Sequence, residues 1–219
     1  MTAAPSVDAL SRHTPAEERA NMLTHALGVV LSVVGVFFLL TAARRAEAPY
    51  ALASCAIYGV TLVLLYTAST LYHRDPKPRL RTLDHIAIFL LIAGTYAPFE
   101  LVTLRGGWGW GLFAITWGLA VFGVVLELTP LRRFRGAMIA LYIAMGWVGL
   151  IALTPLVAAL PGAGLWLLFG GGAMYTGGVV FYRMHRLRYH HAVWHLFVLG
   201  GSVLQYFAVL CYVLPQARV

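Results

Sequence analysis

Two histidines near the end of the chain have the spacing of a metal-binding pair. His191 and His195 are four residues apart in a segment whose other side chains are mainly apolar. On a helix, both imidazoles would project from one face, one turn apart. Two imidazoles at this spacing can bind one transition-metal ion, and a histidine inside a membrane span marks a functional site by default. The pair therefore predicts half of a metal site.

The composition places this pair in a membrane protein. Hydrophobic residues make up 60% of the 219 residues and charged residues only 11%, whereas soluble proteins have roughly 25% charged residues. Several apolar runs reach about 20 residues, the length that crosses a bilayer core. The formal net charge of +8 does not indicate nucleic acid here, because the basic residues lie in short loops between apolar runs. We expect membrane lipids as partners and no nucleic acid.

Seven apolar runs predict an all-α membrane protein, a bundle of seven transmembrane helices. Residues 1–20 form a polar N-terminal segment that lacks the pattern of a cleaved signal peptide. Thr14, Pro15 and Glu17 predict a capped helix start that runs on into the first span. The spans, which form one domain over residues 21–214, are expected at about 21–43, 50–72, 83–104, 108–128, 136–156, 164–182 and 189–214.

The basic residues predict the orientation of the bundle. Twelve of the 16 lysines and arginines precede the first span or lie in the second, fourth and sixth loops. Because basic loops stay in the cytoplasm, this asymmetry places the N-terminus in the cytoplasm and the C-terminus outside. The histidine pair then lies at the cytoplasmic end of the seventh span.

The same topology brings further ligands to that end. His73 ends the second span there and Asp84 opens the third. His73, His191 and His195 can therefore supply the three protein ligands of a catalytic zinc ion, which would activate water at neutral pH. Asp84 could orient a ligand or act as a base, and Ser69 lies one turn before His73 on the same face.

Two further groups of polar residues could surround this site. Glu18, Asn21 and His25 share one face of the first span and could form a polar lid or a second shell, or only an interfacial helix. Ser202 and Gln205 continue the face of the histidine pair deeper into the membrane. They could line a cavity for a lipid-like substrate or ligand.

Each candidate also has a purely structural explanation. The histidine pair could contact lipid head groups, Ser69 could bond its own backbone, and Asp84 could be a carboxylate favoured at a helix start. We expect His190 to be a solvated loop residue. We expect Glu100, near the outer end of the third span, to meet outer head groups, and the two cysteines to be buried free thiols.

Several motifs, taken in order, resemble the haemolysin III family, the bacterial branch of the progestin and adipoQ receptors. They are Glu18-x-x-Asn21-x-x-Thr24-His25-x-x-Gly28, Ser69-x-x-x-His73, Leu83-Asp84-His85, Ile92-Ala93-Gly94-Thr95-Tyr96-x-Pro98-Phe99 and His191-x-x-x-His195. The resemblance implies a seven-helix protein of the bacterial cytoplasmic (inner) membrane with zinc bound by the three histidines and Asp84 beside it. The serine, aspartate and histidine pattern is shared with alkaline ceramidases, which implies metal-dependent hydrolysis of a lipid amide.

Three functions follow as hypotheses. The first is a zinc-dependent hydrolase that cleaves an acyl or amide bond of a lipid, with Asp84 and Ser69 as catalytic residues and a role in membrane homeostasis. The second is a non-catalytic membrane sensor or receptor with structural zinc. The third is a haemolysin-type pore former, although seven apolar spans cannot travel in solution. A retinal protein is excluded because the only lysine, Lys77, lies in a loop. The substrate and the oligomeric state are not indicated.

Overall fold

The computed structural model describes residues 13–216, and all the regular elements in this part of the chain are helices. Residues 1–12 of the expected N-terminal segment lie outside the described residues. The main helices are α1 (Pro15–Arg45), α2 (Ala51–Arg74), α3 (Pro78–Pro98), α4 (Gly106–Leu128), α5 (Arg135–Gly146), α6 (Leu153–Ala159), α7 (Gly162–Arg183) and α8 (His190–Ala208). Shorter pieces are η2 (Phe99–Leu104), η3 (Pro130–Arg133), η4 (Val148–Ala152), η5 (Val209–Val213) and α9 (Leu214–Gln216).

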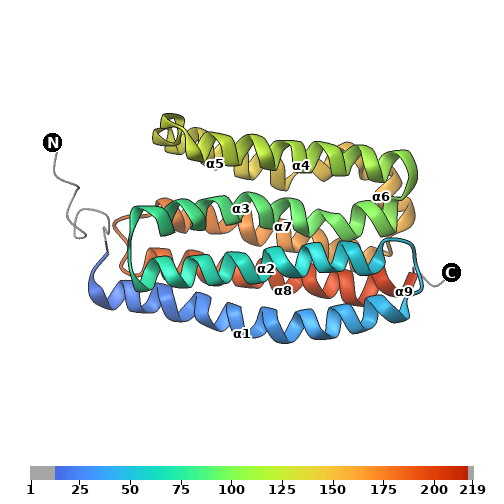
Figure 1. Cartoon of the computed structure of the whole chain (residues 1–219), viewed down its shortest axis with the longest axis horizontal. Helices are drawn as coiled ribbons and strands as arrows, with labels where there is room; N and C mark the ends of the chain where they lie inside the picture. The colour runs from blue at the N-terminus through green and yellow to red at the C-terminus, as the bar shows by residue number, and fades with distance from the viewer. Residues whose placement is uncertain (1–12, 217–219) are drawn as a thin grey trace.

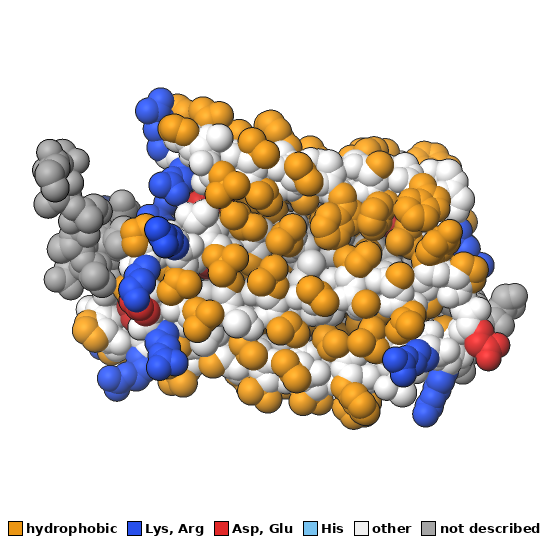
Figure 2. Space-filling model, in the orientation of Figure 1, with side chains coloured by type: hydrophobic (Ala, Val, Ile, Leu, Met, Phe, Trp, Pro, Cys, Tyr) orange, Lys and Arg blue, Asp and Glu red, His pale blue; other side chains and the backbone are white. Residues whose placement is uncertain are grey.

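Within residues 13–216, seven helical segments are long and apolar enough to cross a membrane. They coincide with the seven expected spans to within a few residues, which confirms the all-α fold. The helices run side by side along one direction, and α1 begins at the opposite end from α9 (Figure 1). Large apolar side chains such as Phe37, Val60 and Trp166 are exposed. Apolar side chains cover the flank of the bundle and basic ones gather at its ends (Figure 2), as expected for contact with lipid.

The first helix begins where the sequence predicts. The Thr14 hydroxyl accepts a hydrogen bond from the Glu17 amide at 3.3 Å, and the Glu17 carboxylate accepts one from the Thr14 amide at 2.8 Å. This reciprocal capping box satisfies backbone donors that a helix start leaves free. The second oxygen of Glu17 accepts a hydrogen bond from the Tyr189 amide at 3.1 Å. One residue thus caps α1 and ties it to the start of α8.

The third and fifth spans are not regular helices. Beyond Pro98 the third span continues as the π-helical turn η2. The fifth is interrupted after Gly146, a break that the sequence analysis did not predict. The Tyr96 hydroxyl donates to the Gly146 carbonyl at 2.6 Å and accepts from the Gly149 amide at 3.2 Å. Because backbone polar groups in lipid need partners, Tyr96 stabilises this break.

The expectation for Glu100 is wrong. Its side chain is fully buried, and its Oε1 atom accepts a hydrogen bond from the Thr116 hydroxyl at 2.9 Å. The position of Glu100 along the span suggested the membrane surface, but the π-helical turn directs the side chain toward α4. Both cysteines are free as expected, although Cys55 is buried and Cys211 is exposed.

Helix packing brings the predicted site residues to one end of the bundle. Helices α1 to α4 pack in chain order, and α8 packs against both α7 and α1. Glycines let α7 and α8 approach closely, since a Cβ on Gly171 would lie only 3.0 Å from the Gly201 carbonyl oxygen. The starts of α1, α3, α5 and α8 and the ends of α2, α4 and α7 lie at the same end, which we call the histidine end.

Candidate metal centre

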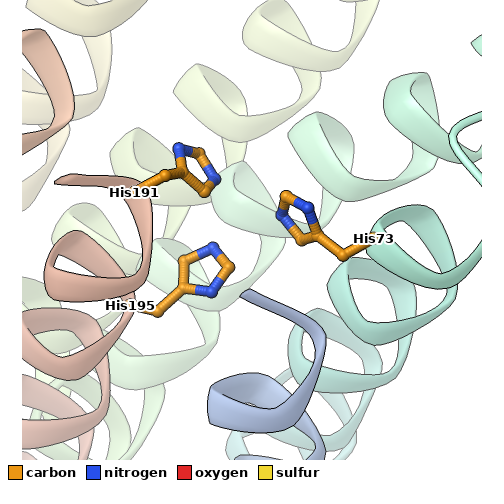
Figure 3. Close-up of side chains that lie close together, drawn as sticks. All are labelled: His73, His191 and His195. Atoms are coloured by element: carbon orange, nitrogen blue, oxygen red, sulfur yellow. The ribbon is translucent and has the colours of Figure 1, made fainter. Parts of the chain in front are cut away.

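Three histidines from two helices meet at the histidine end. His73 lies in the last turn of α2, while His191 and His195 lie in the first two turns of α8, and the three rings converge (Figure 3). One ligand atom from each histidine lies within 4.8 Å of the other two. The ring centroids of His191 and His195 are 4.6 Å apart, and each is 5.0 Å from that of His73. The structure thus brings together the three residues that the sequence singled out.

Hydrogen bonds to two of these rings leave the right nitrogen for a metal. The Nδ1 atom of His73 donates to the Glu18 carboxylate at 2.6 Å, and that of His195 donates to the Asn21 carbonyl at 3.1 Å. Both partners accept hydrogen bonds, so Nδ1 carries the proton and Nε2 has a free lone pair. The Nε2 atom of His73 is buried and has no hydrogen-bond partner among the described residues. Metal-binding histidines show this arrangement, so the residues present fit a metal ion.

The polar face of α1 packs directly on the histidine cluster. Besides their bonds to the two ligands, Asn21 and Glu18 contact one another, since the Asn21 amide donates to the Glu18 carboxylate at 3.4 Å. The ring of His25 stacks on that of His195 with centroids 3.5 Å apart. Asn21 and His25 are almost completely buried. All three residues therefore contact the histidine cluster.

Asp84 and Ser69 lie beside the histidines on the wall of one cavity. The Asp84 carboxylate is partly buried and interacts with the Ser69 side chain, and its charge acts on His73 and His85. Ser69 is buried and lines the same cavity as Asp84 and the three histidines of the cluster. His85 itself points to α4, where its Nδ1 atom lies 3.1 Å from the Glu127 carboxylate. Asp84 is thus the carboxylate that the fold presents to this cavity beside the cluster.

The cavity extends from the histidine end far into the bundle. Its volume is about 590 Å³, within the range of about 300 to 1,000 Å³ that is usual for small-molecule sites. Arg81 and Phe99, both on its wall, are 18 residues apart along the third span, a distance of roughly 27 Å at the rise of a helix. Leu104, Leu112 and Leu156 line it far from the histidines. A long apolar chamber of this kind suits a lipid chain.

Ser202 and Gln205 are placed differently from one another. Gln205 lines the cavity, as expected. Ser202 is buried behind the wall, where its hydroxyl lies 2.8 Å from those of both Tyr66 and Tyr175. Tyr175 lines the cavity, so Ser202 acts on it by holding this tyrosine. Neither tyrosine was predicted from the sequence as a site residue. Tyr66 could have been, since it lies three residues before Ser69 on the same helical face.

Two further histidines lie next to the cluster, His13 before the first helix and His190 at the start of α8. His190, expected in solvent, is buried, and its Nδ1 atom donates to the Phe181 carbonyl at 3.1 Å. The expectation was wrong because His190 is the first residue of α8, after Tyr189 in a left-handed conformation, and its ring packs against the end of α7. The ring of His13 lies 5.2 Å from that of His191. Burial lowers the pKa of His13 below its ordinary value, which favours the neutral form of this ring.

Comparison with known proteins assigns the chain to a family. A family model described as "Haemolysin-III related" matches residues 13–206. The chain belongs to the haemolysin III family. It is 45% identical to "Hemolysin-3" of Bacillus cereus, over 92% of this chain and 94% of the relative. It is 44% identical to the "Hemolysin-3 homolog" of Bacillus subtilis (strain 168), over 90% and 94%. To the human "Monocyte to macrophage differentiation factor" it is 29% identical, over 90% and 84%.

Glu18 offers the first test of the metal centre in this haemolysin III protein. Replacing Glu18 by glutamine keeps its shape but removes the charge that supports His73. The affinity for zinc is expected to fall by about 10- to 100-fold, the usual cost of losing such a partner. Competition with a coloured zinc chelator measures this affinity. The matched control is Glu47→Gln at the opposite end of α1; equal affinities in both variants would show that Glu18 does not support the ligand.

Proposed function

We propose that this haemolysin III protein is a zinc-dependent hydrolase that cleaves an acyl or amide bond of a membrane lipid. The observation that carries the proposal is the convergence of His73, His191, His195 and the Asp84 carboxylate on the wall of one long apolar cavity. Three neutral histidines are the ligand set of catalytic zinc sites that keep one position open. The acidic group and the chain-sized cavity are the parts that a purely structural metal site would not need.

In this reaction the residues of the chain would have the following roles. Zinc, when bound, supplies an activated water and polarises the substrate carbonyl. Asp84 accepts the proton of the attacking water and passes it to the leaving group as a general base and acid. Ser69 contacts Asp84 and orients its carboxylate. Glu18 and the Asn21 carbonyl hold the rings of His73 and His195 in their metal-binding orientation.

The cavity would receive the apolar part of the substrate. A lipid chain extending from the histidine end toward Phe99 and Leu156 places its first polar bonds beside the cluster. Tyr175 and Gln205 face that chain and can donate hydrogen bonds to polar groups along it. In this proposal the histidine end is cytoplasmic, because most basic residues flank it. The protein then acts in the bacterial inner membrane on lipids supplied from that bilayer, and contributes to membrane homeostasis.

A second candidate is a non-catalytic sensor in which the metal is structural. It is supported by the connections through the cluster, since the ligands and their hydrogen-bond partners join α1, α2 and α8.

The names of the Bacillus relatives suggest lysis instead. That function has less support, because the far end of the cavity is lined by leucines and not by the polar groups of an aqueous pore.

The test of the hydrolase is release of fatty acid by the purified protein. Zinc-loaded protein in liposomes that contain ester and amide lipids is expected to release fatty acid, detected by mass spectrometry. Chelation should stop the release and added zinc should restore it. If zinc-loaded protein releases fatty acid from none of these lipids, the catalytic proposal is wrong.

A further inference from the structure

Three arginines line the cavity at the histidine end. Arg81 lies in the first turn of α3, Arg135 is the first residue of α5 and Arg183 is the last residue of α7. All three belong to the wall of the cavity that also holds His73 and Asp84. Arginines from three helices therefore line the cavity at the histidine end, and we call this part of the cavity the arginine mouth.

These charges are not neutralised by ion pairs within the described chain. The ion pairs found among residues 13–216 are His73 with Glu18, Lys77 with Asp75, and His85 with Glu127, so none involves the three arginines. The charges of Arg81 and Arg135 act on one another. The charges of Asp84 and Glu127 attract Arg81 and Arg135 respectively, but neither carboxylate forms an ion pair with these arginines. The Arg135 guanidinium lies 3.2 Å from the Nδ1 atom of His85. An anion between Arg81 and Arg135 would offset their mutual repulsion.

The positive-inside tendency alone does not explain the position of these arginines. It accounts for basic residues near this membrane face, and several of them are exposed and absent from the cavity wall. Arg79, Arg133 and Arg186 are examples, each a few residues from one of the three lining arginines. Arg81 and Arg135 are partly buried instead, and Arg183 lines the cavity although it is exposed. Of the arginines at the histidine end in the described chain, only Arg81, Arg135 and Arg183 line the cavity.

We propose that the arginine mouth binds the phosphate of an anionic phospholipid whose acyl chain occupies the cavity. Guanidinium groups bind phosphate through paired, charge-assisted hydrogen bonds. A phosphate has more oxygen atoms than a carboxylate, so three guanidinium groups fit a phosphate better. Apolar walls below the mouth strengthen such contacts because they exclude water. A phosphate at this level leaves the first acyl bonds beside the histidine cluster. The inference names the substrate class and to that extent rests on the proposed function.

Lipid binding by the full chain tests the inference without any turnover. Zinc-loaded protein in detergent is titrated with phosphatidic acid, phosphatidylcholine of the same chains, or oleic acid, and bound lipid is counted by native mass spectrometry. The wild type is expected to bind phosphatidic acid at least several-fold more tightly than the other two lipids. The triple variant Arg81→Gln, Arg135→Gln, Arg183→Gln should lose about tenfold or more of that affinity while its affinity for phosphatidylcholine and its zinc content stay unchanged.

The matched control is the triple variant Arg79→Gln, Arg133→Gln, Arg186→Gln. It has the same net charge, is altered in the same three regions, and should bind phosphatidic acid as the wild type does. Equal loss in both triple variants would show only a general attraction of charges and would overturn the inference. So would equal affinity of the wild type for all three lipids, or displacement of phosphatidic acid by millimolar inorganic phosphate, which would indicate a site for a soluble anion.

The two proposals can fail separately. Selective binding of phosphatidic acid without fatty acid release from any lipid would contradict the hydrolase but support phosphate binding by the arginine mouth. Fatty acid release by a protein that binds phosphatidic acid no more tightly than the other lipids would support the hydrolase and contradict the phosphate site. Binding and turnover are therefore measured on the same preparation.

Discussion

Replacing His195 by alanine is expected to reduce the zinc content of the purified protein to less than about a tenth of the wild-type value. Loss of a supporting hydrogen bond already costs about 10- to 100-fold in metal affinity, and His195 is proposed as one of the three ligands themselves. The change also removes the hydrogen bond between the His195 ring and the Asn21 carbonyl and the stacking of that ring on His25. Elemental analysis by inductively coupled plasma mass spectrometry measures the result.

Two further variants keep this prediction falsifiable. His185→Ala removes an exposed histidine of the loop between α7 and α8 and should retain the metal. His191→Ala should lose it as His195→Ala does, although this ligand is less buried. All three proteins should elute like the wild type in size-exclusion chromatography. A well-folded His195→Ala protein with full zinc content would refute the three-histidine site.

The second large effect is expected for Asp84→Asn, which should lower turnover by about 10²- to 10⁴-fold, the usual contribution of a general acid or base. The amide keeps the size of the carboxylate but cannot accept a proton at neutral pH. Zinc content should be unchanged, because Asp84 is not among the three convergent ligands. Initial rates of fatty acid release with wild-type and variant protein at equal metal occupancy measure the effect.

The control for this variant is Asp75→Asn, in the loop between α2 and α3. Asp75 pairs with Lys77 and is not part of the cavity wall, so its replacement should leave turnover unchanged. Complementation of a deletion strain separates the hydrolase from the sensor. An Asp84→Asn protein that keeps its zinc and fully restores the wild-type phenotype would contradict the hydrolase and favour a non-catalytic role.

The histidine cluster could be predicted because helix periodicity shows which residues share a face and span topology shows which residues share an end of the bundle. His191 and His195 share a face by spacing alone, and counting spans brings His73 and Asp84 to the same end. The same reasoning placed Glu18 and Asn21 on one face of the first helix. It could not show that Asn21 acts through its backbone carbonyl, because that contact depends on how closely α1 and α8 approach.

The interruptions of the helices were the least predictable part of the fold. Apolar composition identifies the fifth span, but its break after Gly146 depends on the hydroxyl of Tyr96, which lies 50 residues earlier and satisfies the freed backbone groups. The burial of Glu100 likewise depends on a π-helical turn. The arginines were recognised as topological signals, while the cavity that distinguishes three of them arises only from tertiary packing.

The capping and ligand contacts of α1, α2 and α8 have a consequence for how the chain is assembled in its membrane. His73 is synthesised and inserted long before His191 and His195, and Glu17 and Glu18 earlier still, yet all of them meet in one place. The site therefore comes into existence only when the last helix joins the first two. Metal binding adds its free energy to the folded state alone. An ion bound as proposed would therefore hold the completed bundle together. Metal supply would then govern how many newly made molecules remain closed.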